Sequence, residues 1–231
     1  LGAPTFSGVS SSTPTPMICE KCRVLPVLVV CLLGSAPTGL AAPPDGADRE
    51  RERAIVNAPA VSAAGPIVID GRFDEPVWAL APVVGELVQR EPAEGAEPTE
   101  RTEARLAYDA VALYVAIRAF DREPGKITGM LTRRDERSPS DWLKVAIDSY
   151  YDRRTAYEFG VNPAGVKTDR YYFNDGANDD SWDAVWDVQV TRDAEGWRAE
   201  FKIPFSQLRF ARGGGPVGVA IIRDLPRANE T

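Results

Sequence analysis

The chain has 231 residues, a formal net charge of −7, 44% hydrophobic residues and no histidine. Without imidazole, the Ser-His-Asp and Cys-His nucleophile systems, a histidine general base and histidine-ligated zinc are excluded. The excess of acidic side chains argues against nucleic-acid binding, which relies on Lys and Arg to neutralise phosphates. The length suits one sizeable domain or two small ones.

The segment 17–41 has the three parts of a secretory signal peptide. Lys21 and Arg23 form a basic start, and residues 24–33 form an apolar run too short to span a bilayer as a helix. Small residues follow, and we expect cleavage after Ala41. Met17 is then the expected initiator, and residues 1–16 are expected to be translated upstream sequence, the alternative being a genuine Ser/Pro-rich leader. This predicts an exported protein of the periplasm or cell envelope.

The three cysteines, Cys19, Cys22 and Cys31, all lie within this segment. The CxxC spacing of Cys19 and Cys22 has no second pair and no βαβ context, so we interpret it as coincidence. The mature chain is therefore expected to contain no cysteine and to need no disulfide.

Residues 42–64 are rich in Ala and Pro around a charged run at 48–53, which predicts a flexible linker. After it the chain changes to short segments rich in β-branched and aromatic residues, with a spacing of roughly 8–12 residues. This pattern predicts an all-β fold, an antiparallel β-sandwich of the jelly-roll or immunoglobulin-like kind, in one domain over 65–231. The expected strands are 67–70, 86–90, 102–108, 113–121, 143–148, 156–162, 166–174, 185–191, 197–203 and 217–223.

Turn signals separate these strands, and helix is scarce. The strongest signal is the Asn-Pro-Ala-Gly sequence at 162–165, where Pro and Gly suit a tight reversal. Further hairpin turns are expected at 108–112, 152–154 and 193–196. Helical turns are expected only at 74–80, 125–131 and 204–208.

Carboxylates are densest at 174–183, a polar stretch that connects two expected strands. Oxygen ligands in a flexible loop suit Ca²⁺ better than a transition metal, and the candidate ligands are Asp175, Asp179 and Asp180. The segment lacks the ligand alternation of an EF-hand loop, so the alternative is a connection whose Asp and Asn side chains cap turns. Carboxylates also leave a glycoside hydrolase open, which needs two carboxyl groups about 5–10 Å apart.

Aromatic residues are concentrated between positions 142 and 197. An aromatic face can stack on a sugar ring while Arg, Asn and Asp beside it bond to hydroxyl groups. Because alternate residues of a strand face the core, we expect about half of these aromatic residues to be structural. Trp182 lies between polar neighbours in a loop and is expected to be exposed, whereas Trp78 is expected in the core.

Residues 69–78, IDGRFDEPVW, resemble the IDGxxDExxW opening of the family 9 carbohydrate-binding-module-like domains, the cellulose- and xylan-binding group. The resemblance continues in order over essentially all of 67–231. Its further motifs are TEAR at 102–105, YD at 108–109, LYV at 113–115, Asp148, GWRAE at 196–200 and IPF at 203–205.

Four further motifs are similar to one subgroup of these domains, found at the N-terminus of large bacterial outer-membrane proteins of unknown function. They are DRRTAY at 152–157, VNPAG at 161–165, SWDAVW at 181–186 and IPFSQLRF at 203–210. In such proteins a region resembling an outer-membrane β-barrel follows. The resemblance therefore implies a barrel partner in a full-length chain, or else a free-standing sensor domain.

The resemblance implies a β-sandwich that binds oligo- or polysaccharides without catalysis, in the context of xylan or cellulose catabolism. Two aromatic side chains of the family clamp a terminal sugar, and calcium can be structural. By their loop-like settings we expect Trp142 and Trp182 as the clamp, with Arg170, Tyr172 and Asn174 as polar or stacking partners. No catalytic residue is predicted. The alternatives are an interaction domain of an outer-membrane barrel protein and, less favoured, a glycoside hydrolase.

Overall fold

The computed structural model describes residues 57–61, 65–174, 176–212 and 216–231. The predicted signal peptide and most of the predicted linker lie outside these residues. Within them, no helix is long and apolar enough to cross a membrane.

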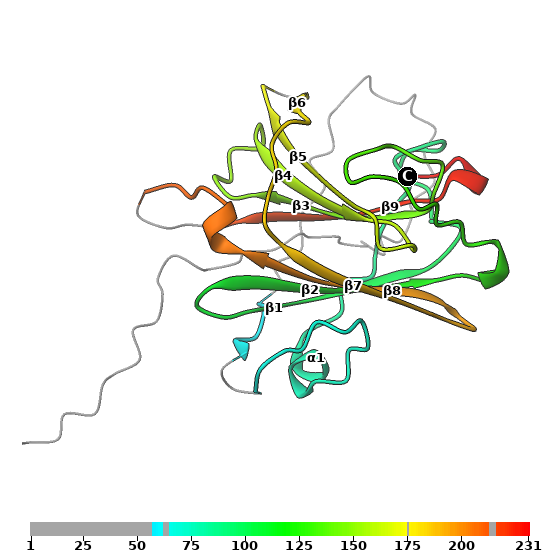
Figure 1. Cartoon of the computed structure of the whole chain (residues 1–231), viewed down its shortest axis with the longest axis horizontal. Helices are drawn as coiled ribbons and strands as arrows, with labels where there is room; N and C mark the ends of the chain where they lie inside the picture. Colours follow the sequence, from blue (N-terminus) through cyan, green and yellow to red (C-terminus); the bar gives the residue numbers. More distant parts are fainter. Residues whose placement is uncertain (1–56, 62–64, 175, 213–215) are drawn as a thin grey trace, which may run out of the picture.

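Two antiparallel sheets pack face to face, which confirms the all-β sandwich (Figure 1). Sheet A has the order β1 (Thr102–Tyr108), β2 (Ala112–Phe120), β8 (Gly196–Pro204) and β7 (Asp187–Asp193). Sheet B has the order β6 (Ala177–Asp179), β5 (Lys167–Phe173), β4 (Ala156–Val161), β3 (Trp142–Asp148) and β9 (Gly218–Asp224). The helical turns are α1 (Pro76–Leu80), η2 (Pro124–Lys126), η3 (Phe205–Gln207) and η4 (Pro226–Ala228).

Eight of the ten expected strands are present, and the expected strands at 67–70 and 86–90 are not. Their backbone groups are used elsewhere: the Asp70 N–H donates to the Glu200 side chain, and the Gln89 N–H donates to the Ala96 carbonyl. β6, a short polar strand, was not expected. The three expected helical turns form as α1, η2 and η3.

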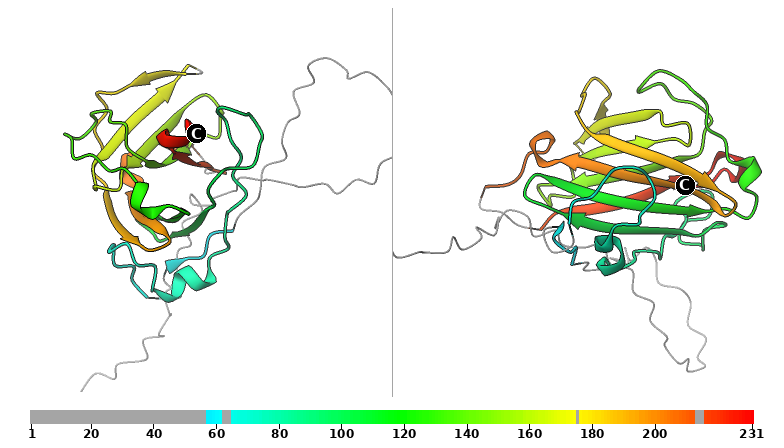
Figure 2. Two further views of the ribbon diagram at one scale, coloured as in Figure 1. Left: turned by 90° about the vertical axis from the view of Figure 1, so that its right-hand side faces the viewer. Right: turned by 60° about the horizontal axis from the view of Figure 1, so that its bottom comes forward.

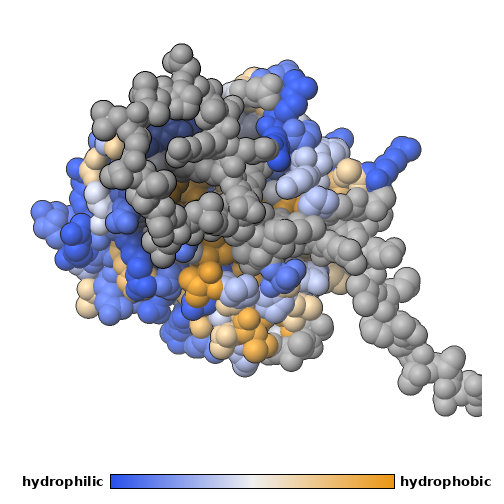
Figure 3. All heavy atoms as spheres, turned by 180° about the vertical axis from the view of Figure 1, so that it is seen from behind, coloured by the Kyte–Doolittle hydropathy of each residue, from blue (hydrophilic) through white to orange (hydrophobic). Residues whose placement is uncertain are grey.

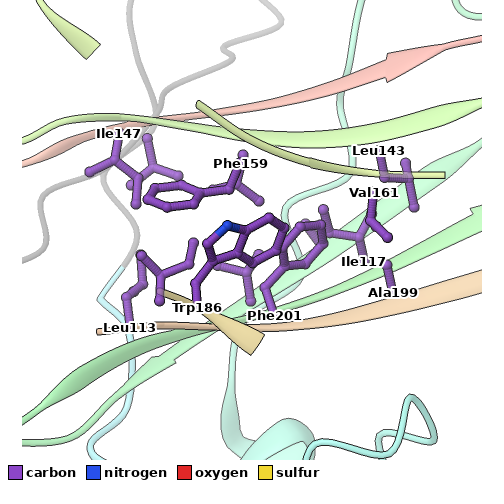
Figure 4. Packing of buried hydrophobic residues seen from close by; sticks show 14 of the residues in the cluster. Leu113, Ile117, Leu143, Ile147, Phe159, Val161, Trp186, Ala199 and Phe201 are labelled. Atoms are coloured by element: carbon purple, nitrogen blue, oxygen red, sulfur yellow. The ribbon is translucent and has the colours of Figure 1, made fainter. Parts of the chain in front are cut away.

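The main core lies between the two sheets (Figure 4). Alternation along each strand sends every second side chain inward, such as Leu143 and Val145 of β3 and Phe159 of β4. Trp186 stacks on Phe201 of β8, with ring centroids 5.8 Å apart. Burial of these large apolar side chains is the main source of stability for the sandwich.

A second apolar layer covers the outward face of sheet A. α1 and the chain that leads into it lie beneath this sheet (Figure 2). Val77 and Trp78 of α1 pack there against Tyr114 and Ala116 of β2. Residues 57–61, expected to belong to a flexible linker, also pack on the sandwich: Ala60 pairs with Tyr108, and Val61 is buried in this layer.

The IDGRFDEPVW motif has a structural role in this layer. Glu200, fully buried on the outward face of sheet A, accepts hydrogen bonds from the N–H groups of Asp70 and Gly71 and from the Trp78 indole. Gly71 has a φ of +80°, and a Cβ there would lie 3.1 Å from Thr191 of β7. Glycine is therefore required where the chain turns against the sheet.

Candidate ligand-binding face

Polar side chains gather on the outward face of sheet B, opposite the face that α1 covers on sheet A. In β3 the inward residues Leu143 and Val145 enter the core, so Trp142 and Lys144 point away from it. The same alternation places Thr168 and Arg170 of β5 outward. Asp224 of β9 lies on the same outward face, because it is the register partner of Trp142 in β3.

These side chains line a depression of about 260 Å³. The Trp142 indole is only 6% exposed and donates to the Ser138 carbonyl over 3.3 Å, so it forms a wall and not a projecting ring. The complete lining is Arg137, Ser138, Ser140, Trp142, Lys144, Thr168, Arg170, Asp224 and Pro226. An indole, three hydroxyl groups and charged groups that converge on one hollow suit a small polar ligand.

Two basic side chains, each paired with carboxylates, organise the strand side of this depression. Lys144 Nζ lies 2.5 Å from Asp224 Oδ2. Arg170 Nε lies 2.6 Å from Asp180 Oδ1, and its Nη1 lies 3.7 Å from Glu158 Oε1. Burial lowers the pKa of Arg170, but its interaction with Tyr172 and the charges of Glu158 and Asp180 outweigh that effect and raise it. Arg170 is therefore a permanent cation in a partly buried setting.

The loop between η2 and β3, residues 127–141, forms the opposite rim of the depression and is called the rim loop. Buried Asn162 donates to the Met130 carbonyl over 2.8 Å and accepts from the N–H groups of Ala164 and Val166. The Met130 N–H in turn donates to Ser140 Oγ. The Asn-Pro-Ala-Gly turn thus forms as expected and also fixes the neighbouring rim loop.

The structure brings some of the predicted sugar-binding residues together and separates others. Trp142 and Arg170 line the same depression. Tyr172 points to the same face of sheet B, and its hydroxyl lies 3.4 Å from Glu158 Oε2. Asn174 follows β5 with a φ of +49° and is exposed, but it does not line the depression.

Trp182 lies on the other side of sheet B, in contrast to the expected pairing with Trp142. Its ring centroid is 5.0 Å from that of Tyr157 and 5.7 Å from that of Phe159, both of which point into the core. The polar neighbours of Trp182 suggested exposure, but the ring turns inward and closes the core beside β4. The two tryptophans therefore cannot clamp one sugar in this arrangement.

Of the predicted calcium ligands, Asp175 lies outside the described residues. The other two make separate contacts: Asp179 Oδ1 accepts from the N–H and hydroxyl of Ser181, and Asp180 pairs with Arg170. Hydrogen bonding to Ser181 lowers the pKa of Asp179. Across the described part of the chain, no group of three or more Cys, Asp or Glu side chains could hold a metal ion. The described carboxylates alone do not form a calcium site, so that site remains a prediction.

The SWDAVW segment is held by a buried carboxylate. Asp169 of β5 is fully buried and accepts hydrogen bonds from the Ala184 N–H over 2.6 Å and from the Trp186 indole over 3.4 Å. Arg134 also pairs with Asp169 and donates to the Ala184 carbonyl. This motif thus attaches the chain before β7 to sheet B and has a structural role.

Several residues of the depression were not predicted from the sequence. Lys144 could have been found, because it is the one cation in the alternating strand LKVAID. Asp224 could not, because its place beside Trp142 depends on the pairing of β3 with β9, which are distant in sequence. Arg137 and Ser138 could not be found either, because they lie in a loop, where the alternation that orients strand side chains does not apply.

A smaller hollow elsewhere on the surface belongs to a structural cluster of charges. A hollow of about 180 Å³ lies near η4 and is lined by Arg223 and Glu100. Arg223 there lies 3.6 Å from fully buried Asp121 and donates to the Phe120 carbonyl, which is a structural ion cluster between the sheets. Among the residues that are coloured in the view from behind, most are hydrophilic, and hydrophobic ones gather towards its lower side (Figure 3).

Comparison with solved structures identifies the fold. The chain is similar to a family 9 carbohydrate-binding module from Caldicellulosiruptor kristjanssonii in complex with cellotriose, with a TM-score of 0.52 and 19% identity over 75% of this chain and 79% of the module. A module of the same family and organism in complex with glucose gives a TM-score of 0.47 and 20% identity over 68% and 72%. A proposed carbohydrate-binding protein from Bacteroides uniformis gives 0.49 and 11% over 66% and 75%.

The first similarity confirms the expected fold, that of the family 9 carbohydrate-binding modules. No protein-family model and no curated protein matches the chain.

Proposed function

We propose that this chain is a non-catalytic glycan-binding module whose ligand lies in the depression on the outward face of sheet B. The observation that carries the proposal is the lining of that depression, where the Trp142 indole stands beside hydroxyl groups and two ion pairs. Aromatic surface suits the C–H face of a sugar, and the polar groups suit its hydroxyls. The shared fold with a module crystallised with cellotriose supports this assignment.

The binding groups have complementary donor and acceptor roles. Lys144 can donate to a sugar hydroxyl while Asp224 accepts from it, because both groups retain free positions when paired with one another. Thr168 and Ser138 add hydroxyl groups, which both donate and accept. A volume near the lower end of the usual range for ligand sites, about 300–1,000 Å³, suits a short stretch of a saccharide.

The carboxylates near the depression support binding over hydrolysis. A glycosidase needs one carboxyl group as acid and a second as base or nucleophile on either side of the scissile bond. Asp224 is paired with Lys144, and Asp180 is paired with Arg170. Glu158 is buried beneath Arg170.

The proposal includes export to the bacterial envelope and a role in the use of polysaccharides such as cellulose or xylan. The predicted signal peptide and the envelope-protein motifs support it. N-terminal sequencing of the protein purified from the periplasm of an expressing bacterium tests the export: the mature chain should begin at Ala42. The proposal also includes a structural calcium ion. Thermal unfolding with and without a chelator tests it, and we expect the chelator to lower the melting temperature.

Titration calorimetry of the full chain with cello- and xylo-oligosaccharides tests the binding site. We expect binding that weakens about tenfold in Lys144→Met, which keeps most of the aliphatic stem and removes the charge. Arg105→Ala is the control, because Arg105 lies on the outward face of sheet A. Equal affinity of wild type and Lys144→Met for every saccharide that binds would refute the location, and the absence of binding to any glycan would refute the function.

A further inference from the structure

We infer that the depression on sheet B selects saccharides that carry a carboxylate, such as oligosaccharides with uronic acid units, and that Arg137 is the residue that recognises it. This inference rests on the proposed function and concerns the chemical class of its ligand. It depends on three observations: the charges of the lining, the unpaired state of Arg137 and the attachment of its loop.

The lining is cationic in a chain that is otherwise acidic. It carries three cations, Arg137, Lys144 and Arg170, and one carboxylate, Asp224, whereas the whole chain has a net charge of −7. An anionic ligand is attracted to those of these cations that no carboxylate of the chain already neutralises.

The three cations differ in what they already contact. Lys144 is paired with Asp224, and Arg170 is paired with Asp180 and Glu158. The exposed guanidinium of Arg137 makes no hydrogen bond or ion pair with any part of the chain that the structure describes. It is therefore the cation available to a bound ligand.

The backbone around Arg137 is held in place. The next residue, Ser138, accepts a hydrogen bond from the Trp142 indole at its carbonyl and lies with its Oγ 2.8 Å from Ser140 Oγ. Farther along the loop, the Asp141 N–H donates to the Thr128 carbonyl, and Asp141 Oδ2 accepts from the Thr128 N–H. A guanidinium carried on a fixed loop loses less conformational freedom when it binds.

A guanidinium recognises a carboxylate through two parallel N–H···O hydrogen bonds, a geometry that a single hydroxyl group cannot match. A uronic acid unit presents such a carboxylate on a sugar ring, so its hydroxyls can meet Lys144 and Asp224 while its carboxylate meets Arg137. A neutral hexose offers only hydroxyls to the same guanidinium.

The test compares an oligogalacturonate and an oligoglucuronate with their carboxyl-reduced, neutral counterparts, using titration calorimetry of the full chain at low salt. We expect the acidic forms to bind about tenfold more tightly than the reduced forms. Arg137→Gln should abolish this preference by weakening the binding of the acidic forms more than that of the neutral forms, and Arg137→Lys should retain part of it. Arg133→Gln is the control, because Arg133 is an exposed arginine of the same loop that does not line the depression.

Equal affinity of the wild type for acidic and reduced forms would overturn the inference and leave the proposed function standing. A preference that survives Arg137→Gln would also overturn it. Binding of a sulfated oligosaccharide without carboxylates as tightly as the uronates would likewise overturn it, because the site would then recognise negative charge and not the planar carboxylate. Failure of every saccharide to bind would overturn both proposals.

Discussion

The Trp78 indole donates a hydrogen bond to Glu200 Oε1 over 3.0 Å and so joins two parts of the chain that are 122 residues apart. The other carboxylate oxygen, Oε2, accepts from the N–H groups of Asp70 and Gly71. One buried side chain thus fixes the segment before β1 to sheet A. Burial raises the pKa of Glu200, and the hydrogen bonds from Gly71 and Asp70 oppose that shift.

We expect Glu200→Ala to lower the free energy of unfolding by about 3 kcal/mol, because three buried donors lose their acceptor. Glu200→Gln should cost about 2 kcal/mol, since its amide NH₂ would face a donor. Urea denaturation followed by tryptophan fluorescence measures both. Glu94→Gln, at an exposed position, is the matched control and should leave stability unchanged. Wild-type stability of Glu200→Ala would contradict the role assigned to this carboxylate.

Stability should depend on pH through Asp193 at the end of β7. The hydrogen bond from Arg118 lowers the pKa of Asp193 from 3.8 to about 2. A lowered pKa in the folded state means that the stabilisation is complete above pH 4 and disappears as pH falls from 4 to 2. Because Asp193 is partly exposed, we expect a contribution of about 1 kcal/mol after allowance for solvent screening.

Asp193→Asn should therefore be less stable than the wild type at pH 6 by about 1 kcal/mol and equally stable near pH 2. Urea unfolding midpoints at several pH values test this. A difference between the two proteins that stays constant across this range would show that the Arg118 pair does not account for the effect.

Trp182 and Trp142 should respond differently to substitution, because they lie on opposite sides of sheet B. Trp182→Ala removes a ring that packs on Tyr157 and Phe159 and should destabilise the fold by about 2 kcal/mol, less than a fully buried tryptophan. It should leave the affinity for saccharides within twofold of the wild type. Trp142→Phe should instead weaken binding, because the indole lines the depression. Thermal unfolding and calorimetry on the same samples separate the two effects.

Asn162→Ala should loosen the rim loop as well as destabilise the domain. The substitution removes the bonds to the Met130 carbonyl and to the N–H groups of Ala164 and Val166, for which we expect a loss of about 2–3 kcal/mol. Amide exchange at Met130 should become faster, because its acceptor Ser140 loses its neighbour Asn162. Unchanged exchange at Met130 would show that the turn and the loop are independent.

The strands of the sandwich could be predicted from the sequence because alternation is a local property. The alternation within LKVAID predicts which of its side chains face the core and which face outward. The structure agrees, with Leu143 inward and Lys144 outward. Segment 67–70 has a similar composition, but its Ile67 and Ile69 side chains pack on the outward face of sheet A, and its Asp70 N–H donates to Glu200. Composition does not distinguish these two uses of an apolar segment.

The candidate site could be predicted only in part. Trp142 was expected from a loop-like setting and Arg170 as its polar partner; the depression contains both, although Trp142 is the first residue of β3. The pairing of Trp142 with Trp182 was wrong because the direction of a loop side chain depends on what the core leaves unfilled. Beside Tyr157 and Phe159, a large ring gains more by burial than its polar neighbours gain by keeping it in water.

The covering of sheet A by α1 and its approach segment bears on how such proteins diversify. The residues that reveal this fold in a sequence, from Ile69 to Trp78, lie on one outward face, while the depression opens on the other. Mutations can therefore change the chemistry of the hollow without disturbing the segment that identifies the fold. Proteins that contain that segment can therefore share a scaffold and differ in the chemistry of this depression.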